Sequence, residues 1–503
     1  MKAFLLQKDR DFELKSELPW NEPALSQDLE LDTLFYAMAG GDRFLFEVAK
    51  AAIVSSLSND LDTILYRQKV LKDGLRHPSI IRELYAIAVE GVESEKKGYW
   101  GLLAKYPVGI LNRSLELLRL QIPILTRLRQ VAEDQANKFE SEGFKTLFAM
   151  LSRELSAEYF ASIQDHLNRL KFRDGALISA ELGKGNKGTN YVLRRTERQS
   201  WLKRMLPPTE PVYSYHLHPR DDAGARALAE LNDRGINLVA NALAQSTDHI
   251  LSFFQMLRTE LAFYVGCLNL HHQLARKGEP NCFPLPAHSG ERKHSFVGLY
   301  DVCLALRLEQ SVVGNDIAAD NKNLVVITGA NQGGKSTFLR SIGSSQLMMQ
   351  AGMFVPANSF SANICNRLFT HYRREEDVTM KSGKLDEELS RMSEIVDDLT
   401  TDSLLLFNES FAATNEREGS EIARHIVSPL LEKRIKIFFV THLYEFARCL
   451  YDRKMENATF RRAERQPDGT RTFKLVEGEP LETSFGPDLY EKIFGADALF
   501  SGR

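Results

Sequence analysis

Cysteine is scarce in this chain, and long apolar runs are missing. The 503 residues include five cysteines, which lie far apart between Cys267 and Cys449 without a CxxC pair. This spacing argues against a disulfide framework and a cysteine-bound zinc site, and it fits a reducing cytosol. We find no uninterrupted apolar run of about 18 residues, so no membrane-spanning helix is expected. The apolar stretch after Met1 is too short for a signal peptide, and we therefore expect a cytoplasmic protein.

An excess of one charge is missing as well. The formal net charge is -3, with 43% apolar and 26% charged residues, which is an ordinary globular composition. The whole-protein charge gives no reason to expect nucleic-acid binding, so any basic surface must be local. At roughly 150 residues per domain, a chain of this length predicts about two to four domains.

The first third of the chain has the apolar spacing of helices. Leu31 and Met38 bracket one apolar face, and Gly40 and Gly41 follow it as a break. A later periodic stretch contains Pro123, which is expected to start or kink a segment because proline lacks the backbone N–H. We therefore expect helices up to about residue 173.

The pattern changes after residue 175. Residues 176–182 and 190–194 flank a turn of glycine, lysine and asparagine, which predicts a β-hairpin. Residues 212–218 alternate and predict a third strand. A helix is expected over residues 247–278, roughly 45 Å long, which would make it a strut between distant parts.

From about residue 295 strands alternate with helices. Residues 323–328, 403–407 and 435–441 are continuous apolar runs, and helical stretches separate them. Runs of this kind are typical of strands buried on both faces of a mainly parallel sheet. The predicted fold is therefore multidomain. A mainly α-helical domain spans residues 1–290 with a small β-hairpin arm at about 175–218, and an α/β domain spans residues 291–503.

A glycine-rich loop follows the first of these strands. It fits the phosphate-binding pattern GxxxxGK[ST], and a helix follows it, as that motif requires. Backbone N–H groups in such a loop face the phosphates, and the helix N-terminus adds positive potential. Lysine would reach the β- and γ-phosphates, and serine would place its hydroxyl on Mg²⁺. The predicted ATP-binding residues are Gly329, Ala330, Asn331, Gln332, Gly333, Gly334, Lys335, Ser336 and Thr337.

Two other strands end in residues suited to the same chemistry. The apolar run "SLLLF" is followed by Asn408 and Glu409, and His442 follows the last apolar run. Glu409 is expected to orient the attacking water, and His442 to sense the γ-phosphate. Asn408 stands where a magnesium-site aspartate is expected. Because an amide brings no negative charge, metal affinity should fall and hydrolysis should be slow.

Several motifs together resemble the MutS family ATPase. The segments "TGANQGGKSTFLRS", "SLLLFNES", "EGSEIARHI" and "VTHLYEFA" have that family's order and spacing over about 200 residues, and "LDTLFYAMAGGDRFL" resembles its helical core and lever region. The resemblance implies an ABC-type ATPase in which two subunits pair across ATP and Mg²⁺. It also implies that Ser382 of one subunit contacts the γ-phosphate held by the other, that Asn315 lies near the nucleotide, and that Asn415 lies near the partner subunit.

The departures from that family matter equally. The chain begins almost directly with the helical core, so we expect the mismatch-reading and connector domains to be absent, along with most of a C-terminal dimerisation module. Asn408 replaces the usual aspartate. The implied function is an ATP-dependent, DNA-associated clamp or sensor related to DNA repair that does not read mismatches in the usual way.

Two other functions stay open. One is a MutS-like nucleotide switch with slow hydrolysis that acts on a ribosome or a protein partner. The other is an unrelated P-loop enzyme such as a small-molecule kinase, which the family-like segments disfavour. A basic stretch at the arm would contact DNA phosphates or be a solvated loop. Its cations are Lys184, Lys187, Arg194, Arg195, Arg198, Lys203 and Arg204.

Overall fold

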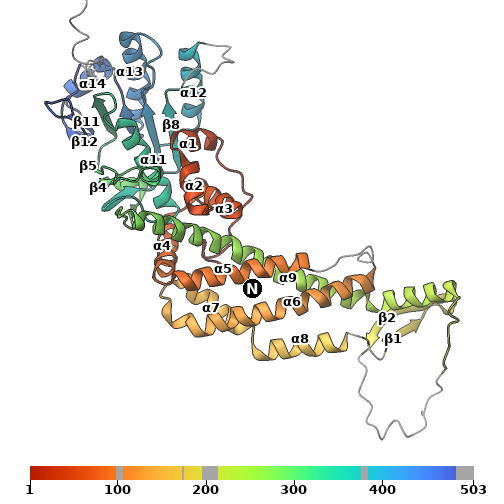
Figure 1. Ribbon diagram of the computed structural model, residues 1–503. Helices are drawn as coiled ribbons and strands as arrows, with labels where there is room; N and C mark the ends of the chain where they lie inside the picture. The colour runs from red at the N-terminus through yellow and green to blue at the C-terminus, as the bar shows by residue number, and fades with distance from the viewer. Residues whose placement is uncertain (98–105, 171, 173–174, 195–212, 375–382, 483–503) are drawn as a thin grey trace, which may run out of the picture. The chain divides into compact units, whose positions relative to one another are not determined.

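The computed structural model describes residues 1–97, 106–170, 172, 175–194, 213–374 and 383–482 (Figure 1). The chain forms two compact units. The first contains Met1–Ala3, Arg82–Glu140 and Phe144–Arg258, and the second contains Phe4–Ile81, Ser141–Gly143 and Thr259–Arg503. Among the described residues, no helix is both long enough and apolar enough to cross a membrane. The domain division predicted at residue 290 stays a prediction.

The first unit is built from long helices. Its α-helices are α5 (Pro78–Glu93), α6 (Pro107–Gln135), α7 (Glu142–Glu154), α8 (Ala157–Arg169) and α9 (Asp222–Arg276), with short 3₁₀ turns at Ser94–Lys97, Ala136–Lys138 and Lys184–Asn186. Helices α5, α7 and α9 also contribute residues to the second unit.

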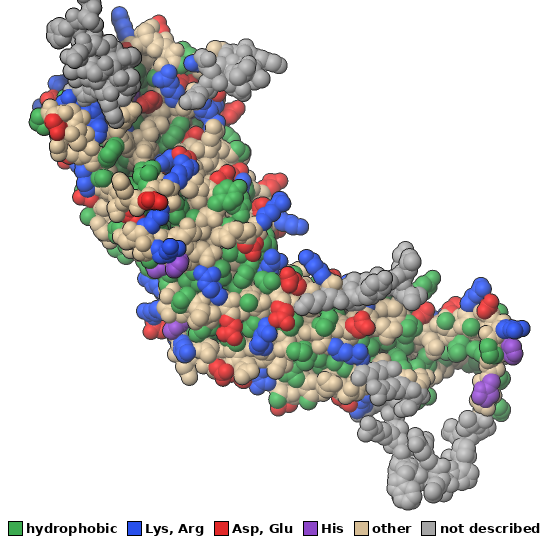
Figure 2. Space-filling view, in the orientation of Figure 1, with side chains coloured by type: hydrophobic (Ala, Val, Ile, Leu, Met, Phe, Trp, Pro, Cys, Tyr) green, Lys and Arg blue, Asp and Glu red, His purple; other side chains and the backbone are tan. Residues whose placement is uncertain are grey.

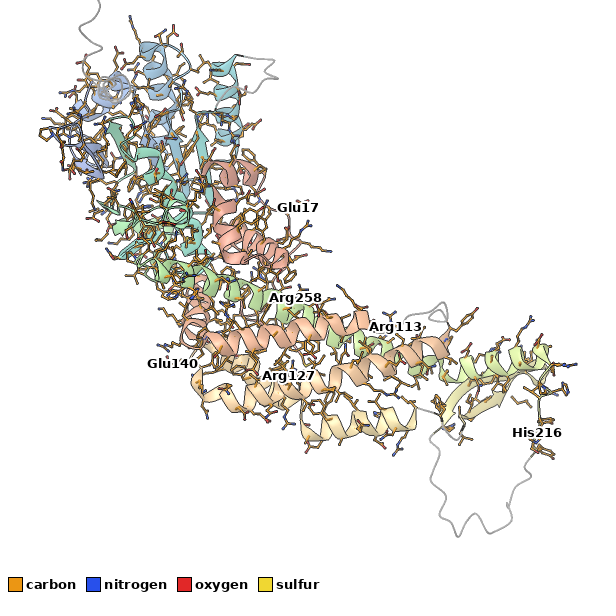
Figure 3. The ribbon with its side chains drawn as sticks, viewed as in Figure 1. Glu17, Arg113, Arg127, Glu140, His216 and Arg258 are labelled. Carbon is orange, nitrogen blue, oxygen red and sulfur yellow. The ribbon has the colours of Figure 1, made fainter. Side chains whose placement is uncertain are left out.

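Close packing and ion pairs hold these helices together. A Cβ atom at Gly91 of α5 would lie 2.4 Å from the Phe254 ring of α9, so only glycine allows this approach. Arg127 of α6 pairs with Glu90 at 2.5 Å, and Arg113 pairs with Glu95 at 3.2 Å (Figure 3). These pairs are largely solvent-exposed, so each contributes about 1 kcal/mol or less. Packing therefore dominates the stability of the unit.

The predicted β-hairpin is present at one end of α9 (Figure 1). Strands β1 (Leu177–Leu182) and β2 (Gly188–Arg194) pair antiparallel, with Leu182 opposite Gly188. The hairpin lies against α9, where a Cβ atom at Gly235 would approach Ile178 to 2.5 Å. This glycine therefore makes room for the hairpin.

Three details of the helical half differ from the expectation. Residues 213–218 form no strand. Their alternating side chains are all exposed, so a strand there would bury no apolar face. Helix α9 begins at Asp222 rather than near residue 247. Its first half is largely solvated and lacks a strong apolar stripe, so the apolar pattern did not reveal it. Helix α6 runs through Pro123, so this proline does not start a segment.

The second unit begins with short helices. They are α1 (Glu22–Asp28), α2 (Leu31–Ala39), α3 (Arg43–Val54) and α4 (Leu61–Arg76), with a 3₁₀ turn at Ser55–Ser58. The predicted apolar face of α2 is buried, and Gly40 ends the helix in the left-handed region, with φ 57°. That conformation favours glycine, because it carries no Cβ.

Two sheets follow. The larger has the strand order β12-β11-β6-β10-β9-β8, and all its pairs are parallel except β11 with β12. Its strands are β6 (Leu324–Gly329), β8 (Arg367–Tyr372), β9 (Ser403–Asn408), β10 (Lys436–Val440), β11 (Ala458–Arg465) and β12 (Arg471–Glu477). The smaller has the order β3-β7-β4-β5, from β3 (Leu285–Ala287), β4 (His294–Leu299), β5 (Asn315–Ala318) and β7 (Ser359–Asn363), with a 3₁₀ turn at Ser289–Glu291. The three predicted apolar runs are thus neighbouring parallel strands.

Helices cover both faces of the larger sheet. They include α11 (Lys335–Gln350), α12 (Lys384–Asp398), α13 (Glu416–Glu432) and α14 (Tyr444–Asp452), whereas α10 (Val302–Arg307) packs against α2 and α11. On one face Val326, Leu405 and Phe439 pack with Met392 of α12 and Val427 of α13 in a single apolar cluster. Helix α11 covers the other face. This arrangement places the carboxyl ends of β6, β9 and β10 together at one end of the sheet.

Candidate nucleotide-binding site

The phosphate-binding pattern forms a tight turn between β6 and α11. Gly329 has φ 106° and Gly334 has φ 82°, and both values favour glycine. A Cβ atom at Gly329 would also lie 2.9 Å from the Ala463 backbone nitrogen of β11. The loop therefore delivers its backbone amides, and the N-terminus of the 16-residue helix α11, to one point. That is the arrangement that holds an anion.

Lys335 places its ammonium group inside this loop. Its Nζ donates to the Gly329 carbonyl at 3.0 Å and to the Ala330 carbonyl at 2.9 Å, and the residue is only 5% exposed. Burial lowers the pKa of Lys335 to about 8, while nearby Glu409 raises it and Arg471 lowers it. Within the described part of the chain Lys335 forms hydrogen bonds to carbonyls and no salt bridge, and a buried cation of this kind favours an incoming anionic ligand.

Ser336 and Asn408 meet across the loop. The Ser336 hydroxyl donates to Asn408 Oδ1 at 2.9 Å, which joins the first turn of α11 to the end of β9. Both are oxygen donors of the kind Mg²⁺ accepts. No group of three His, Cys, Asp or Glu side chains suited to a metal occurs among the described residues. A magnesium ion here would therefore take most of its ligands from phosphates and water, and the two side chains fit that role.

Glu409 lies beside His442 at the same edge. His442 Nε2 is 3.1 Å from Glu409 Oε1, and both side chains are about 30% exposed. The His442 hydrogen bond lowers the pKa of the Glu409 carboxyl, and Lys335 and Arg373 lower it further against the effect of burial. Glu409 also adopts φ 54°, and its amide donates to the Val440 carbonyl of β10. An ionised carboxylate is thus held next to the phosphate loop, where it can accept a proton from water.

Comparison with known proteins identifies the relatives of this site. Residues 325–494, which include the loop, Asn408, Glu409 and His442, match the model of MutS domain V. Residues 59–277 match the model of the MutS2 N-terminal domain. The chain belongs to the MutS family. The two matches together span more than half of the chain.

Individual MutS relatives match part of the chain. The DNA mismatch repair protein MutS of Thermotoga maritima is 34% identical over 191 residues, which cover 38% of this chain and 24% of the relative. MutS protein homolog 4 of Mus musculus is 29% identical over 38% of this chain and 20% of its own length. The DNA mismatch repair protein MutS of Prochlorococcus marinus strain MIT 9301 is 33% identical over 64% of this chain and 34% of its own length. The chain thus spans about a fifth to a third of these relatives.

Asn315 is positioned by β12 in this MutS-family chain. Its Nδ2 donates to the Phe473 carbonyl at 3.1 Å, and its Oδ1 accepts from the Leu475 amide at 2.7 Å. Phe473 is 48% exposed, and a Cβ atom at Gly334 would lie 3.6 Å from its ring. Asn315 therefore ties an exposed aromatic ring to the rim of the loop. Sequence reasoning missed Phe473, because no local motif marks a residue that follows the loop by about 140 positions.

The other predicted residues are less informative. Thr337 lies in the first turn of α11, beside Ser336. Asn415 caps α13, where its side chain accepts from the Glu418 amide at 3.0 Å. Ser382 lies outside the described residues.

The basic stretch at the arm is described only in part. Lys184, Lys187 and Arg194 are exposed, whereas its other four cations lie outside the described residues. Arg194 donates to the Ser179 hydroxyl at 2.8 Å across the hairpin. Figure 2 shows acidic and basic side chains interspersed along the visible face of the helical unit. The described part of the arm therefore carries a small local excess of positive charge.

Proposed function

We propose that this MutS-family chain is an ATPase that uses ATP with Mg²⁺. The amides of the loop and Lys335 would hold the phosphates, and Ser336 and Asn408 would face the metal ion. Bound Mg²⁺ would neutralise charge on the β- and γ-phosphates. The proposal rests above all on the meeting of Lys335, the Ser336–Asn408 bond and the Glu409–His442 pair at one sheet edge.

Glu409 would orient the attacking water and take up its proton. His442 would hold the carboxylate in place and respond to the γ-phosphate. The hydrogen bond from His442 lowers the pKa of Glu409, so its carboxyl stays ionised at neutral pH and can accept a hydrogen bond from the attacking water. The amide at Asn408 brings no charge to the metal, so we expect slow turnover.

Two copies would pair through ABC-type ATPase domains. In this scheme Ser382 of each copy approaches the γ-phosphate held by the other, Asn415 lies near the partner, and Asn315 lies near the nucleotide. The resemblance to MutS ATPases supports this scheme. ATP binding would close the homodimer, and hydrolysis would loosen it. The proposed ATPase domain spans residues 291–503 and the proposed helical domain residues 1–290. The long helices of the helical domain, α9 among them, would transmit the closure to the arm.

We propose that the cargo is DNA, contacted without sequence choice by the hairpin arm. The chain would act in the cytoplasm as an ATP-dependent clamp or sensor that does not read mismatches in the usual way. Three exposed basic residues at the arm and the relatives named as DNA mismatch repair proteins support this choice. The alternative is a nucleotide switch with slow hydrolysis that acts on a ribosome or a protein partner, and the neutral Asn408 favours it.

ATP turnover with and without duplex, branched and single-stranded DNA tests the cargo. We expect DNA to change the turnover. If three arm cations contact phosphates, DNA affinity should fall about 40-fold when NaCl rises from about 50 to about 200 mM. Turnover that ignores DNA, together with absent or salt-insensitive DNA binding, would favour the ribosome or protein partner. A pull-down with and without nuclease treatment would then identify that cargo.

Replacing Asn408 with aspartate should strengthen the metal site. A charged hydrogen-bond acceptor gains about 1 kcal/mol or more over a neutral one, so the Mg²⁺ concentration for half-maximal turnover should fall about five- to tenfold. Turnover at limiting Mg²⁺ should rise accordingly. The matched control is Asn366→Asp, which lies before β8 at the opposite edge of the sheet and should leave both values unchanged. An unaltered Mg²⁺ dependence of the Asn408 variant would contradict the metal role of this residue.

A further inference from the structure

A buried histidine joins three segments behind the proposed catalytic edge. His371, at the end of β8, is 0% exposed. Its Nε2 lies 3.0 Å from the Glu388 carbonyl of α12, and its Nδ1 lies 2.7 Å from the Ser410 hydroxyl. Ser410 follows Glu409 directly, so the ring connects α12 to the backbone of the proposed catalytic residue.

The protons of this contact can be assigned from the donors and acceptors. Burial lowers the pKa of His371 to about 4, so the ring is neutral at physiological pH and carries one N–H. The Glu388 carbonyl can only accept, which places that hydrogen on Nε2. Nδ1 then faces the Ser410 hydroxyl, whose one hydrogen is shared with the His371 backbone carbonyl 2.5 Å away. This tautomer preserves both connections. In the other tautomer Nε2 would carry no hydrogen and could not donate to the Glu388 carbonyl.

Glu388 makes a second connection to the same loop. Its carboxylate faces the Phe411 amide, which lowers the pKa of Glu388 against the larger raising effect of burial. The Phe411 ring stacks on His371 with centroids 5.2 Å apart and planes 22° apart. We name His371, Glu388, Ser410 and Phe411 the His371 cluster. It anchors the two residues that follow Glu409, by side-chain and backbone contacts from β8 and α12.

The backbone that the cluster holds is strained. Glu409 has φ 54° and Phe411 has φ 63°, and neither residue is glycine. Each such residue costs about 1 kcal/mol or more, and it persists only where the surroundings impose it. The His371 cluster supplies those surroundings on one side, and the hydrogen bond from the Glu409 amide to Val440 supplies them on the other.

We propose that Glu388 and His371 are positioning residues for Glu409, which they act on through Ser410 and Phe411. This inference rests on the proposed role of Glu409 in ATP hydrolysis. The cluster fixes the direction in which the Glu409 carboxylate points, while Lys335 and the loop bind the phosphates independently of it. Because Glu388 belongs to α12, a shift of α12 would also turn Glu409 away from the water that it orients.

The test measures turnover and nucleotide affinity separately. Glu388→Ala and Ser410→Ala should each lower kcat about tenfold or more, because small displacements of a catalytic group are costly. The Kd for a non-hydrolysable ATP analogue should stay within about twofold, because this proposal leaves Lys335 untouched. Glu388→Gln keeps an oxygen that can accept from the Phe411 amide, so it should recover most of the activity. Glu394→Gln, on an exposed position of α12, is the matched control and should match the wild type.

A double-variant cycle distinguishes positioning from general damage to the fold. In a Glu409→Ala background, Glu388→Ala should cause no further loss of single-turnover hydrolysis, because the group that it positions is already gone. Equal losses in both backgrounds, or a parallel rise in Kd, would overturn the proposal. Wild-type kcat in both Glu388→Ala and Ser410→Ala would do the same. If the wild-type protein itself hydrolyses no ATP, the proposed function fails instead, and the two failures are thus distinguishable.

Discussion

Replacing Lys335 with alanine is expected to abolish ATP binding. The substitution removes the buried ammonium inside the loop and leaves the Gly329 and Ala330 carbonyls without their donor. Losing one member of a buried charge pair typically costs about 2–5 kcal/mol or more, so Kd should rise about 30-fold or more. Isothermal titration calorimetry with ATP and Mg²⁺ measures this directly.

The control for that variant is Lys433→Ala. Lys433 is exposed and precedes β10, so it lies at the opposite end of the sheet.

In the wild type, the lowered pKa of Lys335 also predicts a pH dependence of ATP binding. Below about pH 8 the ammonium is charged and binding is strong. Above that pH the protein must take up a proton to bind, so affinity should fall as pH rises. ATP affinity that survives the loss of Lys335 would contradict the proposed site.

Replacing Glu409 with alanine should separate binding from hydrolysis. The phosphate loop and Lys335 remain, so ATP affinity should change little. Turnover should fall at least about 100-fold, because no other residue is expected to orient the water. With ATP bound and not hydrolysed, the paired form should accumulate. Single-turnover assays and light scattering with ATP measure the two effects.

A matched control keeps this experiment specific. Glu432→Ala removes an exposed carboxylate from the end of α13 and should behave as the wild type. Glu409→Gln keeps the size of the side chain but not its basicity, and it should resemble Glu409→Ala in turnover. Wild-type turnover in Glu409→Ala would show that another group orients the water. A single-copy mass with ATP present would contradict the pairing instead.

Local patterns predicted the parts of the molecule that depend on local chemistry. The continuous apolar runs became the buried strands β6, β9 and β10, because a strand covered on both faces needs apolar side chains throughout. The phosphate loop followed from glycines whose positive φ angles few other residues tolerate. The strand ends brought Asn408, Glu409 and His442 to one edge, since parallel strands end together.

Contacts between distant segments could not be predicted in this way. Phe473 reaches the loop only because β12 extends the sheet beyond β11. The role proposed for His371 depends on Glu388 and Ser410, which belong to other elements and lie far from it in the sequence. Residues 213–218 show that a local pattern can also predict too much, because an alternating sequence forms no strand without a partner strand or a face to bury.

Helix α11 is enclosed on every side. Thirteen of its 16 residues are buried, and a single methyl group at Gly343 would meet Leu29 at 2.7 Å and Leu406 at 2.9 Å. A helix seated so tightly has no room to rotate or slide by itself. A nucleotide bound at its N-terminus would therefore act on the strand ends and rim segments around the loop, with the helix as their common support.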